Sequence, residues 1–186
     1  MGKQTSLAPA RVLIVIPDWG LAWYMFCLEH AVELSKSGKE VSVLDLSNLN
    51  PILVTRRFWR LVLRISQKNR MIDIKGKILK DNQIKSIECT LSRQKSPTLT
   101  MTVERNEIFR AAIASKYAYI TGRSDTQLDE VESKIVEMER HFFEFTLNLV
   151  TNIQSEYNFG EVITVNGRYI VNGAVVQACK ESQVKC

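Results

Sequence analysis

The stretch RVLIVIPDWGLAWYMFCLEHAVELSKSGKEVSVLDL, residues 11–46, decides the fold of this chain. It opens with Arg11–Ile16, a β-branched run typical of a strand that is buried on both faces. Residues 21–37 then repeat apolar side chains at steps of four, three and four, which predicts a helix, and Gly38 stands where a C-cap glycine belongs. Residues 41–46 predict a second strand. Because crossover connections of this kind are right-handed, the stretch predicts two parallel strands joined by a helix.

The middle of the chain is less regular. Residues 52–67 are apolar and basic at helical spacing. Three short segments near residues 72–74, 77–79 and 84–91 are interpreted as strands or hairpin arms. A further helix is predicted over residues 103–115.

The last third carries the strongest periodic pattern. Apolar side chains alternate steps of three and four over three heptads, at Leu128, Val131, Ile135, Met138, Phe142, Phe145 and Leu149. A dimerising coiled coil is one interpretation, but Val136, Phe143, Leu147 and Val150 widen the stripe and favour a long helix packed into a core. A strand over residues 162–165 and a helix over 169–182 follow.

These elements predict one α/β domain spanning residues 1–186. We expect a Rossmann-like parallel sheet flanked by helices, with an irregular basic insertion at about residues 51–100. That insertion contains 12 Lys/Arg and 3 Asp/Glu and so has a local charge of +9, whereas the net charge of the whole chain is +5. A basic partner surface therefore belongs to the middle third.

The composition excludes several classes of site. The chain has four cysteines, Cys27, Cys89, Cys179 and Cys186, without CxxC spacing, and only two histidines. This argues against a zinc site or a disulfide framework. Reduced thiols in a cytoplasmic protein are the expected state. The chain lacks GxGxxG, the P-loop pattern and GxSxG, although Asp45 ends the second strand where a carboxylate for NAD would stand. No metal or cofactor is therefore expected in this chain.

Two loops are candidates for the functional site. Ligands of open parallel sheets bind beyond the carboxyl ends of the strands, which here means residues 17–20 and 166–168. Asp18 is interpreted as a helix N-cap, with a catalytic base as the alternative. Gly167 and Arg168 combine a permissive turn with a cation at a helix N-terminus, which favours an anion; a plain turn with an Arg–carboxylate pair is the equal alternative.

The segment VNGR followed by a helix containing ACKES resembles the NGR turn and helix of bacterial capsular-polysaccharide and related surface-glycan glycosyltransferases of the two-domain GT-B type. The opening strand, Trp-containing loop and Glu-bearing helix are similar to theirs as well. The resemblance covers roughly residues 11–48 and 160–182. It implies an acceptor-side domain whose acceptor and anion contacts fall on the two loops, at Trp19, Gly20, Asn166, Gly167 and Arg168.

The resemblance also implies how such a domain works. A nucleotide sugar would bind a C-terminal half that is missing here, so this chain alone is expected to be inactive. The acceptor would be a glycan or a lipid-linked glycan, and the protein would lie in the cytoplasm, peripheral to the inner membrane. A basic face over residues 52–68 suits an anionic bilayer, and consists of Arg56, Arg57, Arg60, Arg64 and Lys68. The alternative for that face is pairing with acidic side chains of the helix over residues 130–144.

One further alternative is a non-enzymatic Rossmann-like module. Its basic segment would bind a membrane surface, nucleic acid or a protein partner. Only Phe58 and Trp59 lie near the basic residues as aromatic platforms, which gives little support to nucleic acid.

Overall fold

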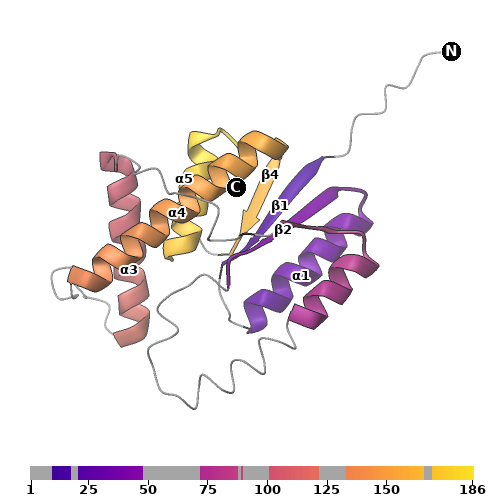
Figure 1. Ribbon diagram of the computed structural model, residues 1–186, viewed down its shortest axis with the longest axis horizontal. Helices are drawn as coiled ribbons and strands as arrows, with labels where there is room; N and C mark the ends of the chain where they lie inside the picture. The colour runs from indigo at the N-terminus through magenta and orange to yellow at the C-terminus, as the bar shows by residue number, and fades with distance from the viewer. Residues whose placement is uncertain are drawn as a thin grey trace.

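The computed structural model describes residues 10–17, 21–47, 72–87, 89, 101–121, 133–165 and 169–186. These residues build a parallel four-stranded sheet with helices on both faces, a Rossmann-like α/β fold (Figure 1). The elements are β1 (Arg11–Ile16), α1 (Leu21–Lys36), β2 (Glu40–Asp45), β3 (Lys85–Ile87), α3 (Val103–Thr121), α4 (Ser133–Tyr157), β4 (Glu161–Thr164) and α5 (Ile170–Glu181). Residues 72–81 form a further helix between β2 and β3.

The strand order is β3-β2-β1-β4, and every pairing is parallel. The central strand β1 is buried on both faces, because Val12 to Ile16 are all 0% exposed. This confirms the interpretation of its β-branched run. Val12 and Ile14 pack with α1 on one face, while Leu13 and Val15 pack with α4 and α5 on the other.

The predicted strand–helix–strand unit is confirmed to within one residue at each boundary. Gly38 has φ +86°, the left-handed conformation that a glycine adopts after a helix without a side-chain clash. The buried face of α1 is rotated from the predicted one, since Met25 and Val32 are half-buried while Tyr24 and Cys27 are buried. The reason is that Tyr24 reaches a polar partner beneath the helix, described below.

The interpretation of residues 72–79 as strands or hairpin arms is wrong, because residues 72–81 are helical. Gly76 interrupts the apolar pattern there, and the packing that stabilises the helix comes from elsewhere in the chain. Ile78 and Leu79 pack against the α1 side of the core. The following strand β3 joins the sheet edge beside β2, so this part of the middle third belongs to the main fold.

The helix α4 is a core helix, as its wide apolar stripe predicted. Phe142, Phe145 and Leu149 are buried in the core that α3, α4 and α5 form over the sheet, and the ring of Phe143 meets that of Phe109 edge to face at 5.7 Å. Leu128 and Val131, the first two positions of the stripe, lie outside the described residues.

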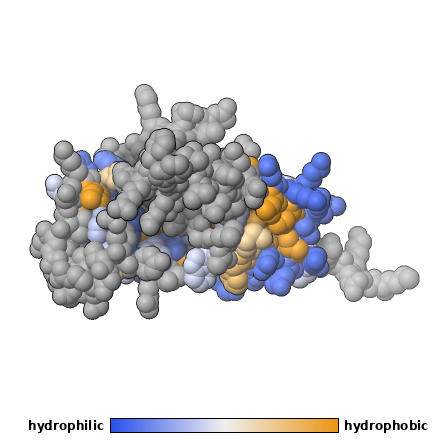
Figure 2. All heavy atoms as spheres, turned by 90° about the horizontal axis from the view of Figure 1, so that it is seen from below, coloured by the Kyte–Doolittle hydropathy of each residue, from blue (hydrophilic) through white to orange (hydrophobic). Residues whose placement is uncertain are grey.

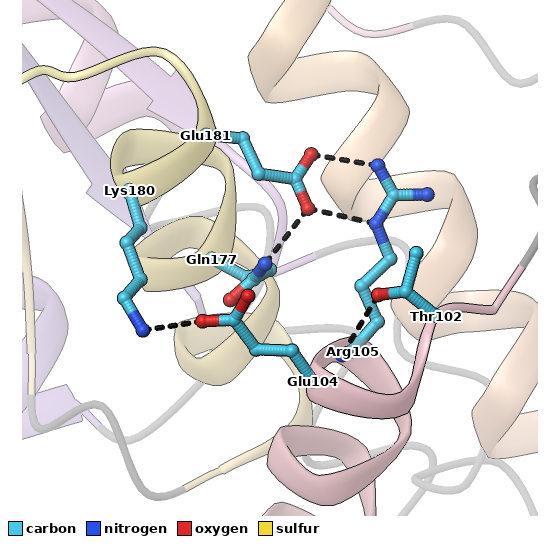
Figure 3. Close-up of polar contacts among 6 residues, drawn as sticks. All are labelled: Thr102, Glu104, Arg105, Gln177, Lys180 and Glu181. Atoms are coloured by element: carbon cyan, nitrogen blue, oxygen red, sulfur yellow. Dashed lines mark hydrogen bonds and ion pairs between the residues drawn. The ribbon is translucent and has the colours of Figure 1, made fainter.

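Charged side chains join α3 to α5 (Figure 3). Arg105 donates two hydrogen bonds of 2.7 Å to the carboxylate of Glu181, and Gln177 donates a third. A second pair, Lys180 with Glu104, lies beside them. Among the described residues, no helix is both long and apolar enough to cross a bilayer.

Candidate functional site at the carboxyl edge of the sheet

The carboxyl ends of β1 and β4 are neighbours at one edge of the sheet. The chain leaves β1 toward β2 on one side and returns to β4 on the other, so the strand order reverses between β1 and β4. The two strands pair in register up to Val15 and Thr164. A reversal of this kind opens the crevice in which ligands of open α/β sheets bind.

The two predicted loops follow these two strand ends directly. Their candidate residues lie outside the described residues, so their side chains are not placed; they are Asp18, Trp19, Gly20, Asn166, Gly167 and Arg168. The basic face over residues 52–68 also lies outside the described residues, namely Arg56, Arg57, Arg60, Arg64 and Lys68. The roles assigned to all of these residues stay predictions.

The helix α5 begins right after the second loop. Its N-cap residue, Tyr169, is extended, and its side chain makes no capping hydrogen bond. The first turn carries no acidic residue. The N-terminal end of a helix has unpaired backbone N–H groups and a partial positive charge, so this end is suited to an anion in the crevice.

A buried asparagine, which the sequence analysis did not identify, fixes the end of β4 to α5. Asn172 is 2% exposed, and its amide donates a hydrogen bond to the carbonyl of Val165. The hydroxyl of Thr164 lies 3.4 Å from its Oδ1. Thr164, the last residue of β4, and Val165 immediately precede the Asn166–Arg168 loop, so Asn172 fixes the chain where that loop begins. An asparagine within the apolar run IVNGAVV was the available signal.

The most connected polar group at this edge is Asp45, at the end of β2. Its carboxylate accepts hydrogen bonds from the Tyr24 phenol at 3.0 Å, from Lys75 at 2.9 Å, and from the backbone N–H and hydroxyl of Ser47. The Asp45 side chain is only 6% exposed. Asp45, which ends the strand where a carboxylate for NAD would stand, thus already binds three protein side chains and a backbone N–H.

The Asp45 cluster raises two neighbouring pKa values. Burial, and then the Asp45 charge and hydrogen bond, raise the pKa of Tyr24 above its usual range. Burial, and then the same charge, raise the pKa of the Cys27 thiol to about 11. Tyr24 therefore stays a hydrogen-bond donor, and Cys27 is a protonated, weakly nucleophilic thiol at neutral pH. Tyr24 thus joins α1 to the end of β2 at this edge, and Cys27 belongs to the core beneath α1.

The opposite, amino edge of the sheet is held by ion pairs. Arg11 pairs with Glu40 at 3.0 Å, while Glu161 pairs with Lys39 and Lys185. Hydrogen bonds from Lys185 and Lys39 lower the pKa of Glu161. These charges have partners within the protein, so the carboxyl edge is the better candidate for a ligand.

The described residues near the crevice form no cluster of metal-binding groups. Within the part of the chain that the structure describes, no three His, Cys, Asp or Glu side chains are placed to hold a metal ion. All four cysteines are free. Comparison with known protein families, curated proteins and solved structures gives no match for this chain.

Proposed function

We propose that this chain is the acceptor-binding domain of a GT-B-like glycosyltransferase of surface or capsular polysaccharide assembly. In this proposal it holds a glycan or lipid-linked glycan acceptor at the carboxyl edge of the sheet. A separate nucleotide-sugar-binding half supplies the donor, so this domain alone is inactive. The resemblance of the opening strand–helix unit and of the NGR segment to that family supports the assignment.

One structural observation carries the proposal. The strands β1 and β4 end side by side at the point where the strand order reverses. The two segments in which the sequence concentrates candidate contacts follow these strand ends directly. Segments 149 residues apart in the chain, counted from Trp19 to Arg168, thus leave the sheet from neighbouring positions. A crevice at such a reversal is a general site for ligands of this fold class.

The proposed roles follow from side-chain chemistry. Arg168 would bind an anionic group of the acceptor, such as a phosphate, together with the N-terminus of α5. Asn166 would donate and accept hydrogen bonds to sugar hydroxyls, and Gly167 would allow close approach of the backbone. Trp19 would offer an apolar face to a sugar ring, with Gly20 leaving room beside it. Asp18 is the candidate base that takes the proton from the acceptor hydroxyl as it attacks the donor sugar.

The proposed partner surface is the inner membrane. The basic face over residues 52–68 would hold the domain on anionic lipids, with each Lys or Arg near the surface contributing on the order of 1 kcal/mol. Lipid-linked acceptors are embedded in that surface, so docking would raise their local concentration at the crevice.

Titration of the isolated domain tests the proposal. A soluble short-chain prenyl-diphosphate glycan should bind and shift NMR signals of Thr164, Val165 and Asn172, which lie next to the second loop. Arg168→Gln should weaken this binding by roughly tenfold, the effect of about 1.4 kcal/mol from one charge-assisted contact. Arg110→Gln, at an exposed arginine on α3, is the matched control and should change nothing.

Nucleotide sugars provide the opposing measurement. Calorimetric titration with several of them should give no binding at micromolar concentration. Micromolar binding of any one of them to this domain would contradict the proposed division between acceptor and donor halves. Acceptor binding that Arg168→Gln leaves intact would contradict the proposed anion contact.

A further inference from the structure

Large apolar side chains are concentrated on the surface at the start of two helices. Within the part of the chain that the structure describes, exposed side chains of this kind occur in the first two turns of α1 and at the start of the helix over residues 72–81. We call these four the apolar patch: Trp23 (55% exposed), Phe26 (53%), Ile72 (38%) and Ile74 (45%). The other two, Val103 and Met138, lie apart on α3 and α4.

A shared anchor brings the two halves of the patch together. Tyr24 and Lys75 bond the same oxygen of Asp45, Oδ2, at 3.0 and 2.9 Å. Trp23 directly precedes Tyr24, and Ile74 directly precedes Lys75. The starts of the two helices therefore lie side by side.

The far ends of the two helices are also in contact. The Ser35 hydroxyl donates a hydrogen bond to the carbonyl of Asn82 at 3.1 Å, so the helices run parallel along the same face of the sheet (Figure 1). Figure 2 shows hydrophobic residues gathered in this part of the molecule, with hydrophilic ones on one side of them. The patch lies at the same edge of the sheet as the crevice, because both helices start there.

The aromatic half of the patch is ordered. The Trp23 and Phe26 rings meet edge to face at 6.4 Å, and Phe26 stacks on His30 at 6.1 Å. The four side chains together expose on the order of 400 Å² of surface, an area that on a monomer commonly marks a binding site. Burial of these two exposed rings would lower the free energy by removing apolar surface from water, so a partner is expected.

The chemistry around the patch favours a lipid bilayer over a protein partner. Lys77 and Lys80 are exposed on the same helix as Ile72 and Ile74. Lysine is depleted at protein interfaces, whereas Trp and Lys together are typical of segments that lie in the membrane interface. The same helix exposes Asp73 and Asp81, but residues 51–100 as a whole, these four residues included, carry a local charge of +9.

We propose that the apolar patch inserts into the interface of an anionic bilayer and turns the carboxyl edge of the sheet toward it. Only this orientation rests on the proposed function, because it would present the crevice to a lipid-linked acceptor. Binding by the patch differs from electrostatic docking by the basic face. Apolar insertion keeps its strength as salt rises, whereas charge attraction is screened.

The fluorescence of Trp23 tests insertion directly. The chain has three tryptophans, so Trp19→Phe with Trp59→Phe leaves Trp23 alone. With vesicles of phosphatidylglycerol and phosphatidylcholine, its emission should shift to the blue and be quenched by lipids brominated near the headgroup. Unchanged emission of vesicle-bound protein would overturn the proposal.

Cosedimentation gives a second test that keeps Trp19 and Trp59 in place. Trp23→Ser with Phe26→Ser should weaken binding to the same vesicles by roughly tenfold or more, since two apolar rings no longer leave water. Val103→Ser removes an exposed apolar side chain outside the patch and should have no effect. Circular dichroism confirms that each variant is folded.

Two other outcomes would also overturn the proposal. Vesicle binding equal in native protein and in the Trp23/Phe26 variant would mean that the patch does not insert. A dimer in solution that dissociates in that variant would mean that the patch is covered by a second copy of the chain. Titration with a soluble acceptor in the absence of vesicles tests the proposed function separately, since the variant should keep acceptor binding.

Discussion

Tyr24 of α1 donates a hydrogen bond of 3.0 Å to Asp45 at the end of β2, and both side chains are removed from water. This bond joins the first turn of a helix to the carboxyl end of a strand at the edge where the crevice opens. It also accounts for the burial of Tyr24 beside Leu28, which the apolar spacing of α1 correctly placed in the core. The same carboxylate receives Lys75, so one aspartate organises three segments.

Removal of the Tyr24 hydroxyl should therefore destabilise the fold. Tyr24→Phe leaves the ring in place but takes one donor from a buried carboxylate, with an expected loss of about 1–3 kcal/mol in the free energy of unfolding. Urea denaturation measures it. Ser37→Ala removes an exposed hydrogen bond and should change stability by less than about 0.5 kcal/mol. Equal losses in the free energy of unfolding for the two substitutions would mean that the Tyr24–Asp45 bond stabilises the fold no more than an exposed hydrogen bond does.

The Arg105–Glu181 pair should make stability depend on acid. A hydrogen bond and the charge of Arg105 lower the pKa of Glu181 in the folded protein. The stabilisation is therefore present above the unfolded pKa, about 4.3, and is lost as pH falls through the lower folded value. Arg105→Gln should cost about 1–2 kcal/mol near pH 7 and progressively less below about pH 4.

Thermal unfolding of native protein and Arg105→Gln across that pH range measures the difference. The neighbouring Lys180–Glu104 pair is exposed, so Lys180→Gln serves as the control and should lower the stability less than Arg105→Gln does near pH 7. If the loss of stability caused by Arg105→Gln stays constant down to about pH 3, where Glu181 takes a proton, the loss comes from packing of the arginine and not from the ion pair.

A buried pair between α3 and α4 predicts a pH dependence that sets in at higher pH, because the pKa of its carboxyl group is raised. Glu139 is 0% exposed, Lys116 donates to its Oε1 at 2.7 Å, and burial raises its pKa although Lys116 opposes the shift. Lys116→Met should cost about 3–5 kcal/mol near pH 7, because it leaves a buried carboxylate unpaired. Since the folded pKa lies above the unfolded value, the cost should shrink as pH falls toward about 4 and Glu139 takes a proton.

The double variant Lys116→Met with Glu139→Gln separates charge from packing. It removes the carboxylate charge, so it should recover most of the lost stability near pH 7. Failure to recover, together with a pH-independent cost of Lys116→Met, would show that the lysine stem and not the ion pair stabilises the contact.

The four thiols should differ in reactivity. The pKa of Cys186 is lowered by a hydrogen bond from Cys179, although burial opposes the shift, and Cys186 is exposed. The pKa of Cys27 is raised to about 11 by burial and the Asp45 charge. The pKa of Cys179 is also raised, by its hydrogen bond to Cys186 and by burial. Iodoacetamide at neutral pH should therefore label Cys186 first and the buried Cys27 and Cys179 last, as peptide mass spectrometry can follow. Asp45→Asn should speed labelling of Cys27, and unchanged labelling would rule out the effect of that charge.

Local patterns predicted the elements whose stability is local or fully buried. The run Arg11–Ile16 has no polar side chain after its first residue, so only a strand covered on both faces suits it. The wide stripe of α4 likewise predicted a core helix. The helix over residues 72–81 was not predicted, because its stability depends on long-range packing of Leu79 beneath α1 and on the Lys75–Asp45 pair.

The candidate site was predictable only in outline. A Gly-containing turn after each of two strands indicates that candidate residues lie at the carboxyl edge of the sheet. Whether the two turns are neighbours depends on the strand order, which a sequence pattern does not encode. The roles of Asp45 and Asn172 as internal partners depend on which side chains reach them, namely Tyr24, Lys75 and the end of β4. Such contacts between distant segments have no local signature.

The last prediction separates the contribution of the basic face over residues 52–68 to membrane binding from that of the apolar patch. Arg56, Arg60 and Arg64 recur every four residues, and no acidic residue lies among them, so an anionic surface is a favourable partner. Replacing all three by Gln should weaken cosedimentation with anionic vesicles at low ionic strength, because about 3 kcal/mol of attraction is lost, and the binding that remains through the apolar patch should persist as salt rises. Residual binding by the patch variant should, in contrast, vanish as salt rises, since it depends on charge alone. If the three replacements instead lower the melting temperature sharply, and native protein binds neither neutral nor anionic vesicles, the arginines are structural and membrane docking is wrong.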